Sequence, residues 1–308
     1  MEKQYNASID KATALDFAIR DGQKEYDYGY EISGKSSYKN YLSNDDWKRF
    51  IDSMSPLHFA QYNDADGGEL IEKKGRWGLN PPKMASFGSS SRLIYECSKS
   101  IPGFCFEKQL PTRVGHTANL DGYLSSPTED VFVEAKCREI YSTHLNQKIS
   151  RVYKDVYEYI KSVNSGFSYE DTPIEDEPDY MACSFLMNDK YISHFDIKQL
   201  ICHFLGICAN ILENHANANV RFIYLIFNPN FDTDFSNQNI HAFQSKILEE
   251  YNETLAEIDS FSDFKWLFNT IMDYQAEHLG LHKPIFNFEF NFQDHCCPVK
   301  VPDDYYNV

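Results

Sequence analysis

Short apolar and alternating runs predict three consecutive strands in the first half of the chain. They lie at 104–110 (FCFEKQL), 118–124 (ANLDGYL) and 131–137 (VFVEAKC), and turn residues bound each of them. A helix over 84–100, with a serine available as its N-terminal cap, precedes them. Because the connections between the strands are short, we expect neighbouring strands to pair with each other.

Two further apolar segments complete this core. The long run 195–212 (FDIKQLICHFLGICANIL) predicts a buried helix, and 221–227 (RFIYLIF) predicts a buried strand. The order over 84–228 is therefore helix, three strands, helix, strand. This order predicts an α/β fold with a mixed central sheet and helices on its faces.

Three more regions accompany this core. We expect an accessory N-terminal region over 1–83, an insertion over about 138–193, and a C-terminal helical extension over 229–308 that packs on the core. The elements expected in them are helices over 8–22 and 44–54, a glycine- and proline-rich linker over 67–82, a helix around 146–163, an acidic loop over 169–179, helices near 239–258 and 262–278, and an edge strand at 286–292.

Two of the predicted strands bring acidic residues face to face. If the turn that joins the second and third strands is centred just after Pro127, Asp121 lies directly opposite Glu134. Opposite residues of an antiparallel pair have Cβ atoms roughly 4.5–5.5 Å apart. Lys136 comes two residues after Glu134 and therefore shares its side of the strand. The pattern predicts two carboxylates and one amine at a single point of the sheet.

This triplet has the composition of a site for a hard divalent cation. Like charges held opposite each other are destabilising, and a cation offsets that cost. Mg²⁺ or Mn²⁺ prefers oxygen ligands and keeps several waters, so Asp121, Glu134 and the carbonyl of Ala135 are the expected ligands. The ion would polarise a phosphoryl oxygen and lower the pKa of a bound water. Lys136 would position that water and stabilise the developing negative charge, which predicts phosphodiester hydrolysis.

Asp121, followed after an apolar strand by Glu134-Ala135-Lys136, resembles the D…(D/E)-x-K signature of the PD-(D/E)XK nuclease superfamily, which includes restriction endonucleases and RecB-type nuclease domains. The resemblance covers 84–228 and implies a restriction-endonuclease-like αβββαβ core, with helical additions at both ends. It departs from the family pattern at Leu120, where the family has proline, and in the long insertion after Lys136.

The resemblance also implies further site residues. The family often adds an acidic ligand, for which Glu96 on the first helix fits the family position better and Glu107 on the first strand is the alternative. Glu107 pairs with Asp121 if the turn after it is centred on Val114, and either glutamate can equally be a surface carboxylate. RecB-like nucleases carry a Q-xxx-Y element, which Gln199 resembles with His203 in the tyrosine position. A buried glutamine and histidine satisfied by backbone groups explain the same two residues.

Composition limits the partners of the chain. The net charge of −17 argues against a generally basic surface, yet eight Lys and Arg stand against three Glu within 72–113. A locally basic face can hold a phosphate backbone, and solvated lysines explain the same composition equally well. The eight cysteines include no Cys-x-x-Cys pair, so zinc is not expected.

The sequence is compatible with several functions. The leading one is a Mg²⁺-dependent nuclease, with DNA as the expected substrate and a homodimer as an option. The alternatives are a catalytically inactive module of the same fold that binds nucleic acid or another partner, and a two-carboxylate glycosidase, in which Lys136 has no evident role. The sequence has no long apolar segment and no hydrophobic signal region at its start, so we expect a cytoplasmic protein with no membrane partner.

Overall fold

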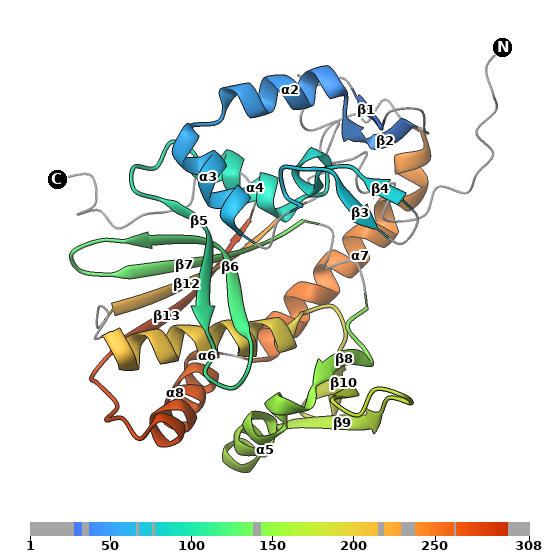
Figure 1. Cartoon of the computed structure of the whole chain (residues 1–308). Coiled ribbons are helices and arrows are strands. Elements are labelled where there is room, and N and C mark those ends of the chain that lie inside the picture. Colours follow the sequence, from blue (N-terminus) through green and yellow to red (C-terminus); the bar gives the residue numbers. More distant parts are fainter. Residues whose placement is uncertain are drawn as a thin grey trace.

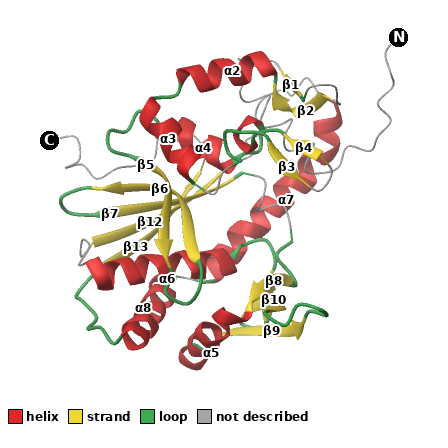
Figure 2. Cartoon of the chain, in the orientation of Figure 1, coloured by secondary structure: helices red, strands yellow, loops and turns green. Residues whose placement is uncertain are grey.

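The computed structural model describes residues 28–32, 37–65, 68–75, 78–137, 143–214, 219–228, 238–261 and 263–294. Within these ranges the chain is a mixed α/β protein with seven α-helices and a five-stranded mixed sheet against which helices pack (Figures 1 and 2). The predicted helix over 8–22 lies outside the described residues. None of the described helices combines the length and the apolar character that crossing a bilayer requires.

The five-stranded sheet contains all four strands predicted for the core. Its strands are β5 (Cys105–Pro111), β6 (Thr117–Ser125), β7 (Asp130–Lys136), β12 (Asn219–Ile226) and β13 (Asn287–Asp294), in the order β13-β12-β7-β6-β5. The first three form an antiparallel meander, and β12 runs parallel to β7. Every residue of the central strand β7 is buried, as expected for a strand with neighbours on both sides and helices packed on the sheet.

Two helices hold the sheet where the candidate residues lie. Helix α4 (Ser90–Ser98) begins at Ser89, whose side chain accepts a hydrogen bond from the backbone N–H of Arg92, and it packs on β6 and β7. Helix α6 (Ile197–Asn214) packs on β5 and β6. Its close approach depends on Gly206, because a Cβ there would lie 2.9 Å from the Cβ of Ala118 and 3.0 Å from that of Leu110.

The C-terminal part of the chain adds more than helices to this core. Helices α7 (Gln238–Ser260) and α8 (Lys265–Leu279) are present as predicted, and β13 is the predicted edge strand. Strand β13 pairs in parallel with β12, and its Phe288 stacks on Phe268 of α8 with ring centroids 3.9 Å apart. The central sheet is thus completed by a strand from beyond residue 228.

The insertion holds a second sheet that the sequence patterns did not predict. Its elements are β8 (Gln147–Ser150), α5 (Lys154–Val163), β9 (Phe167–Pro173), β10 (Tyr180–Met187) and β11 (Lys190–Ile192), and Figure 1 shows them as a separate layer beside α6 and α8. The prediction of an acidic loop over 169–179 is wrong for its first part, which is strand β9. Buried Phe167 and Tyr169 alternate with polar residues there, so the acidic side chains belong to a strand.

The N-terminal region covers one end of the sheet (Figure 1). It consists of β1 (Tyr28–Glu31), β2 (Ser37–Leu42), α2 (Asn44–Ser53), α3 (Pro56–Asp64) and the short hairpin of β3 (Lys73–Gly75) and β4 (Gly78–Asn80). Helix α2 is the helix predicted over 44–54. The predicted linker over 67–82 contains the hairpin, and the backbone N–H groups of Lys83 and Met84 donate to the carbonyls of Gly68 and Glu69 at 2.9 and 3.0 Å.

Candidate functional site

The strand register places Asp121 beside Glu134, as the turn geometry predicted. Gly122 pairs with Val133 and Ser125 pairs with Asp130, and this register, continued one residue past its last pair, sets Asp121 opposite Glu134. The Asp121 Oδ2 accepts a hydrogen bond from the backbone N–H of Ala135 at 2.7 Å. This bond fixes the Asp121 carboxylate against the Glu134–Ala135 peptide. The carbonyl of Ala135 was the expected ligand, and the contact found for this residue is through its N–H.

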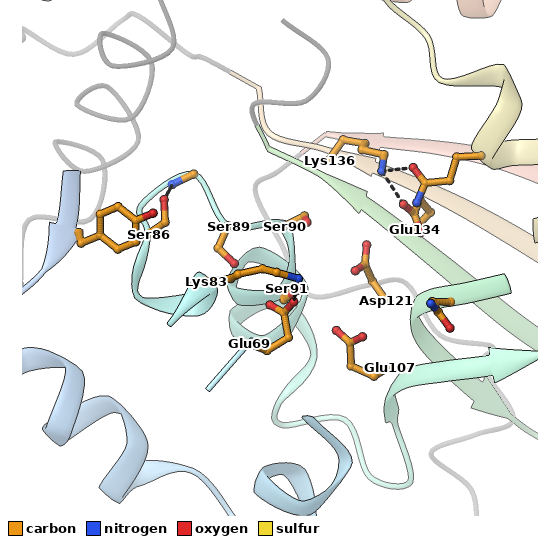
Figure 3. Close-up of a pocket in the computed structure, with 14 residues that line it drawn as sticks. Glu69, Lys83, Ser86, Ser89, Ser90, Ser91, Glu107, Asp121, Glu134 and Lys136 are labelled. Carbon is orange, nitrogen blue, oxygen red and sulfur yellow. Dashed lines mark hydrogen bonds and ion pairs between the residues drawn. The ribbon is translucent and has the colours of Figure 1, made fainter. Parts of the chain in front are cut away.

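Lys136 is held by two acceptors that come from different elements. Its Nζ donates to Glu134 Oε1 at 2.6 Å and to Gln199 Oε1 at 2.5 Å (Figure 3). Glu134 is 2% exposed and Lys136 is 6% exposed, so water screens this ion pair little. Gln199 reaches the site from the first turn of α6, which puts the glutamine singled out in the sequence in direct contact with Lys136.

His203 lies one turn further along α6 and faces the same carboxylate. Its Nδ1 is 3.5 Å from Glu134 Oε2. Burial and the nearby positive charge of Lys136 lower the pKa of His203 to about 3. The imidazole is therefore neutral at physiological pH, and Lys136 is the charge partner that the structure gives to Glu134.

Glu107 faces Asp121 from the neighbouring strand. Phe106 pairs with Gly122 and Lys108 pairs with Leu120, so Glu107 stands opposite Asp121 in the register expected from a turn at Val114. Its backbone has φ 56°, in the left-handed region that costs a non-glycine residue energy. Burial and the negative charges of Asp121, Glu69 and Glu134 raise the pKa of Glu107 to about 9. In the metal-free protein this side chain is a protonated carboxylic acid at neutral pH.

Glu96 does not reach the site. It is on α4 as predicted, but its carboxylate pairs with Lys99 at 2.5 Å, and it is not among the residues that line the pocket. At 3.6 residues per turn Glu96 lies about 140° around the helix from Ser91, which does line the pocket. Of the two acidic residues weighed for the additional position, the structure brings in Glu107.

The candidate residues open into a cavity of about 340 Å³ that has two chemically different walls (Figure 3). One wall holds the acidic residues of the sheet together with Lys136 and Gln199. The opposite wall comes from segments that the sequence predicted to be a linker and the start of a helix. Its members are Tyr41, Glu69, Lys83, Ser86, Gly88, Ser89, Ser90 and Ser91.

The ion pair of Glu69 and Lys83 anchors this second wall. Lys83 Nζ donates to Glu69 Oε1 at 2.6 Å, and Glu69 is buried while the Lys83 side chain is 64% exposed. Sequence reasoning missed both residues as site candidates. The run of three serines at the start of α4 was the one visible signal, and it was read as a helix cap only.

No family model matches this chain. Searches of curated proteins and of solved structures also give no match. The resemblance to PD-(D/E)XK nucleases therefore depends on the motif and on the order of the elements.

The donor set of the acidic wall fits a hard cation that keeps part of its water. Across the described ranges, no three His, Cys, Asp or Glu side chains are arranged so that they alone could hold a metal ion. Mg²⁺ does not need such a cage, because one or two carboxylates, waters and substrate phosphate oxygens complete its shell. Asp121 and Glu134, adjacent on neighbouring strands and both lining the cavity, supply the oxygen ligands that this kind of site requires.

Proposed function

We propose that this protein is a metal-dependent nuclease of the PD-(D/E)XK type that hydrolyses phosphodiester bonds, with DNA as its substrate. The convergence of Asp121, Glu134, Lys136 and Gln199 on one cavity carries the proposal. The order α4, β5, β6, β7, α6, β12 supports it, because this is the αβββαβ order that the family resemblance implies. The described core would then be restriction-endonuclease-like.

Each site residue has a role in that reaction. Asp121 and Glu134 would hold Mg²⁺ or Mn²⁺, which when bound polarises the phosphoryl oxygen and lowers the pKa of a coordinated water. Lys136, paired with Glu134, presents its Nζ to the negative charge that develops on the phosphate. Gln199 accepts from the same Nζ and so limits the directions in which the amine can point.

The catalytic reading has more support than an inactive module of the same fold. A module that only binds has no need to bury Glu134 and Lys136 as an ion pair, because burying two charges is expensive. The carboxylates of Glu134 and Asp121 also make the acidic wall unfavourable for phosphate in the absence of a cation. A site that requires a metal before it accepts phosphate is the arrangement expected of a nuclease.

Incubation of the protein with plasmid, linear DNA and RNA tests the proposal, with Mg²⁺, Mn²⁺ and EDTA in parallel. We expect cleavage with either metal and none in EDTA. Asp121→Asn should lower the rate by at least about 100-fold, a typical loss on removal of one stabilising group, and should lower metal affinity in calorimetry.

Asp171→Asn on strand β9 is the matched control, because it also changes a strand aspartate to its amide. Metal-independent cleavage, or full activity of Asp121→Asn, would contradict the mechanism. The homodimer stays a prediction, and gel filtration of the full chain checks it.

A further inference from the structure

The wall opposite Asp121 and Glu134 carries a separate set of groups suited to binding a ligand. Lys83 brings a positive charge that is largely exposed, and Ser86, Ser89, Ser90 and Ser91 bring hydroxyl groups along the start of α4. The backbone N–H groups at a helix start and hydroxyl donors favour an anion such as phosphate. Figure 3 shows these residues across the cavity from Asp121 and Glu134, so a phosphate held between the two walls would contact both.

Glu69 adds an unsatisfied acceptor to the same wall. Its Oε1 accepts from Lys83, while Oε2 is buried and has no hydrogen-bond partner in the described part of the chain. Glu69 is 7% exposed, and leaving a buried carboxylate oxygen unpaired is costly. A ligand with a hydroxyl donor would satisfy it. In a DNA strand the sugar hydroxyl groups are free only at the ends, because phosphodiester bonds consume them elsewhere.

Tyr41 supplies an apolar surface at the end of the serine wall. It lines the cavity, and its backbone pairs with Ser86 in an isolated β-bridge. A partly buried tyrosine ring beside a phosphate site is the arrangement on which an unpaired base stacks. The cavity of about 340 Å³ is at the small end of pockets for single small ligands, roughly 300–1,000 Å³.

We propose, resting on the nuclease function above, that this cavity binds the terminal nucleotide of an unpaired strand. Its base lies on Tyr41 and its terminal hydroxyl donates to Glu69. A terminal nucleotide with a free sugar hydroxyl carries one phosphate, the scissile phosphodiester that joins it to the strand. This phosphate lies between Lys83 and the α4 serines on one wall and Asp121 and Glu134 on the other. The enzyme removes nucleotides from strand ends and does not cut within a closed strand.

A linear single-stranded oligonucleotide and a covalently closed circle of the same sequence separate this proposal from the nuclease function. With Mg²⁺ we expect the linear strand to yield mononucleotides and the circle to react at least tenfold more slowly. With Mg²⁺ and nuclease-resistant phosphorothioate forms of both strands, we expect at least tenfold tighter binding of the linear strand than of the circle, measured by fluorescence anisotropy. The binding measurement does not depend on catalysis.

The outcomes are distinguishable. If the circle is cut as fast as the linear strand and gives oligonucleotides, the nuclease function stands and terminal binding is overturned. If neither is cut, the nuclease function fails, and binding decides the inference. A linear preference then still supports an end-binding cavity, and equal affinities overturn it.

Variants of the second wall connect the effect to this cavity. Tyr41→Leu and Lys83→Gln should each weaken binding of the linear strand at least fivefold, which is the lower end of the effect of one stacked base. The controls are Tyr191→Leu and Lys148→Gln on the insertion sheet, which remove a partly exposed tyrosine and a lysine paired with a glutamate far from the cavity. Equal losses in pocket and control variants, with folding verified by circular dichroism, would contradict the assignment.

Discussion

The buried pair of Glu134 and Lys136 makes a quantitative prediction about stability. Lys136→Met keeps most of the length of the side chain and removes its charge. The Glu134 carboxylate, in a residue that is 2% exposed, then loses its ion pair. His203 does not readily replace the lost charge, because burial, the largest cause of its lowered pKa, persists in this variant and opposes protonation of the imidazole. Removing one partner of a buried pair costs about 3–5 kcal/mol. We expect Lys136→Met to lose that amount of unfolding free energy at pH 7.

A double variant separates this charge effect from lost packing. Glu134→Gln together with Lys136→Met removes both charges and leaves an uncharged side chain of similar size at each position. Replacing a complete buried pair is often nearly neutral, so the double variant should recover most of the loss. Both variants should be inactive, because the double variant lacks the charges that the mechanism uses. Stability and activity are thus expected to move independently.

Urea unfolding in EDTA, followed by tryptophan fluorescence, measures this cycle. In a thermal melt under the same buffer conditions, the single variant should unfold several degrees below the parent, at roughly 2 °C per kcal/mol for a chain of this size. A loss of less than about 1 kcal/mol in Lys136→Met would show that the carboxylate is solvated or otherwise compensated. A double variant that is less stable than the single one would show that packing dominates. Either result would refute the account of the pair given above.

Two further variants test the neighbourhood of the site. The pKa of Glu107 is raised from 4.5 to about 9, so between these pH values the carboxyl is protonated in the native state and ionised in the unfolded state. The unfolding free energy of the protein therefore falls as pH rises from about 5 to 9. Glu107→Gln should flatten that slope and be more stable at pH 8 in EDTA, checked by melting at pH 6 and pH 8; an unchanged slope would contradict the raised pKa. Gly206→Val should lose about 1–3 kcal/mol, because its Cβ meets Ala118, Leu110 and a backbone carbonyl at 2.9–3.1 Å. It should also lower the cleavage rate, since α6 carries Gln199, and a rate equal to that of the parent would separate helix position from catalysis.

The acidic wall was predictable because its geometry is local. A short turn fixes the register of β6 and β7, and therefore the meeting of Asp121 with Glu134. The register of β5 with β6 follows from its turn in the same way and brings in Glu107. The prediction of Gln199 required a further inference, because it depended on a stripe of polar residues along an otherwise apolar helix.

The features that the sequence did not predict correctly depend on contacts between distant segments or on the side of a helix that a residue occupies. Glu96 lies on the predicted helix, but on a different side of it from the serines that line the pocket. Counting 3.6 residues per turn from those serines would have shown this. The order of strands in the insertion sheet, and the parallel pairing of β13 with β12, join segments that are far apart in sequence. Patterns of single segments identify such strands but do not select their partners.

Glu69 shows the same limit at the site itself. It lies in a glycine-rich stretch without periodicity, and its position follows from backbone hydrogen bonds that close residues 68–84 into one loop. Nothing in the local sequence distinguishes it from a solvated glutamate. Its burial and its bond to Lys83 arise only when the N-terminal region folds over α4.

Under the proposed function, the two walls together account for phosphate binding by an acidic chain. In the metal-free cavity the raised pKa of Glu107 keeps that group neutral, so the charged carboxylates of Glu69, Asp121 and Glu134 face the two lysines Lys83 and Lys136. The cavity then carries one net negative charge and repels phosphate. A bound divalent cation changes the net charge to one positive, at a place where burial makes each charge count more than it does in water. The overall charge of −17 is therefore compatible with phosphate binding, because metal occupancy, and not the average surface charge, sets the sign of the field at the reacting bond.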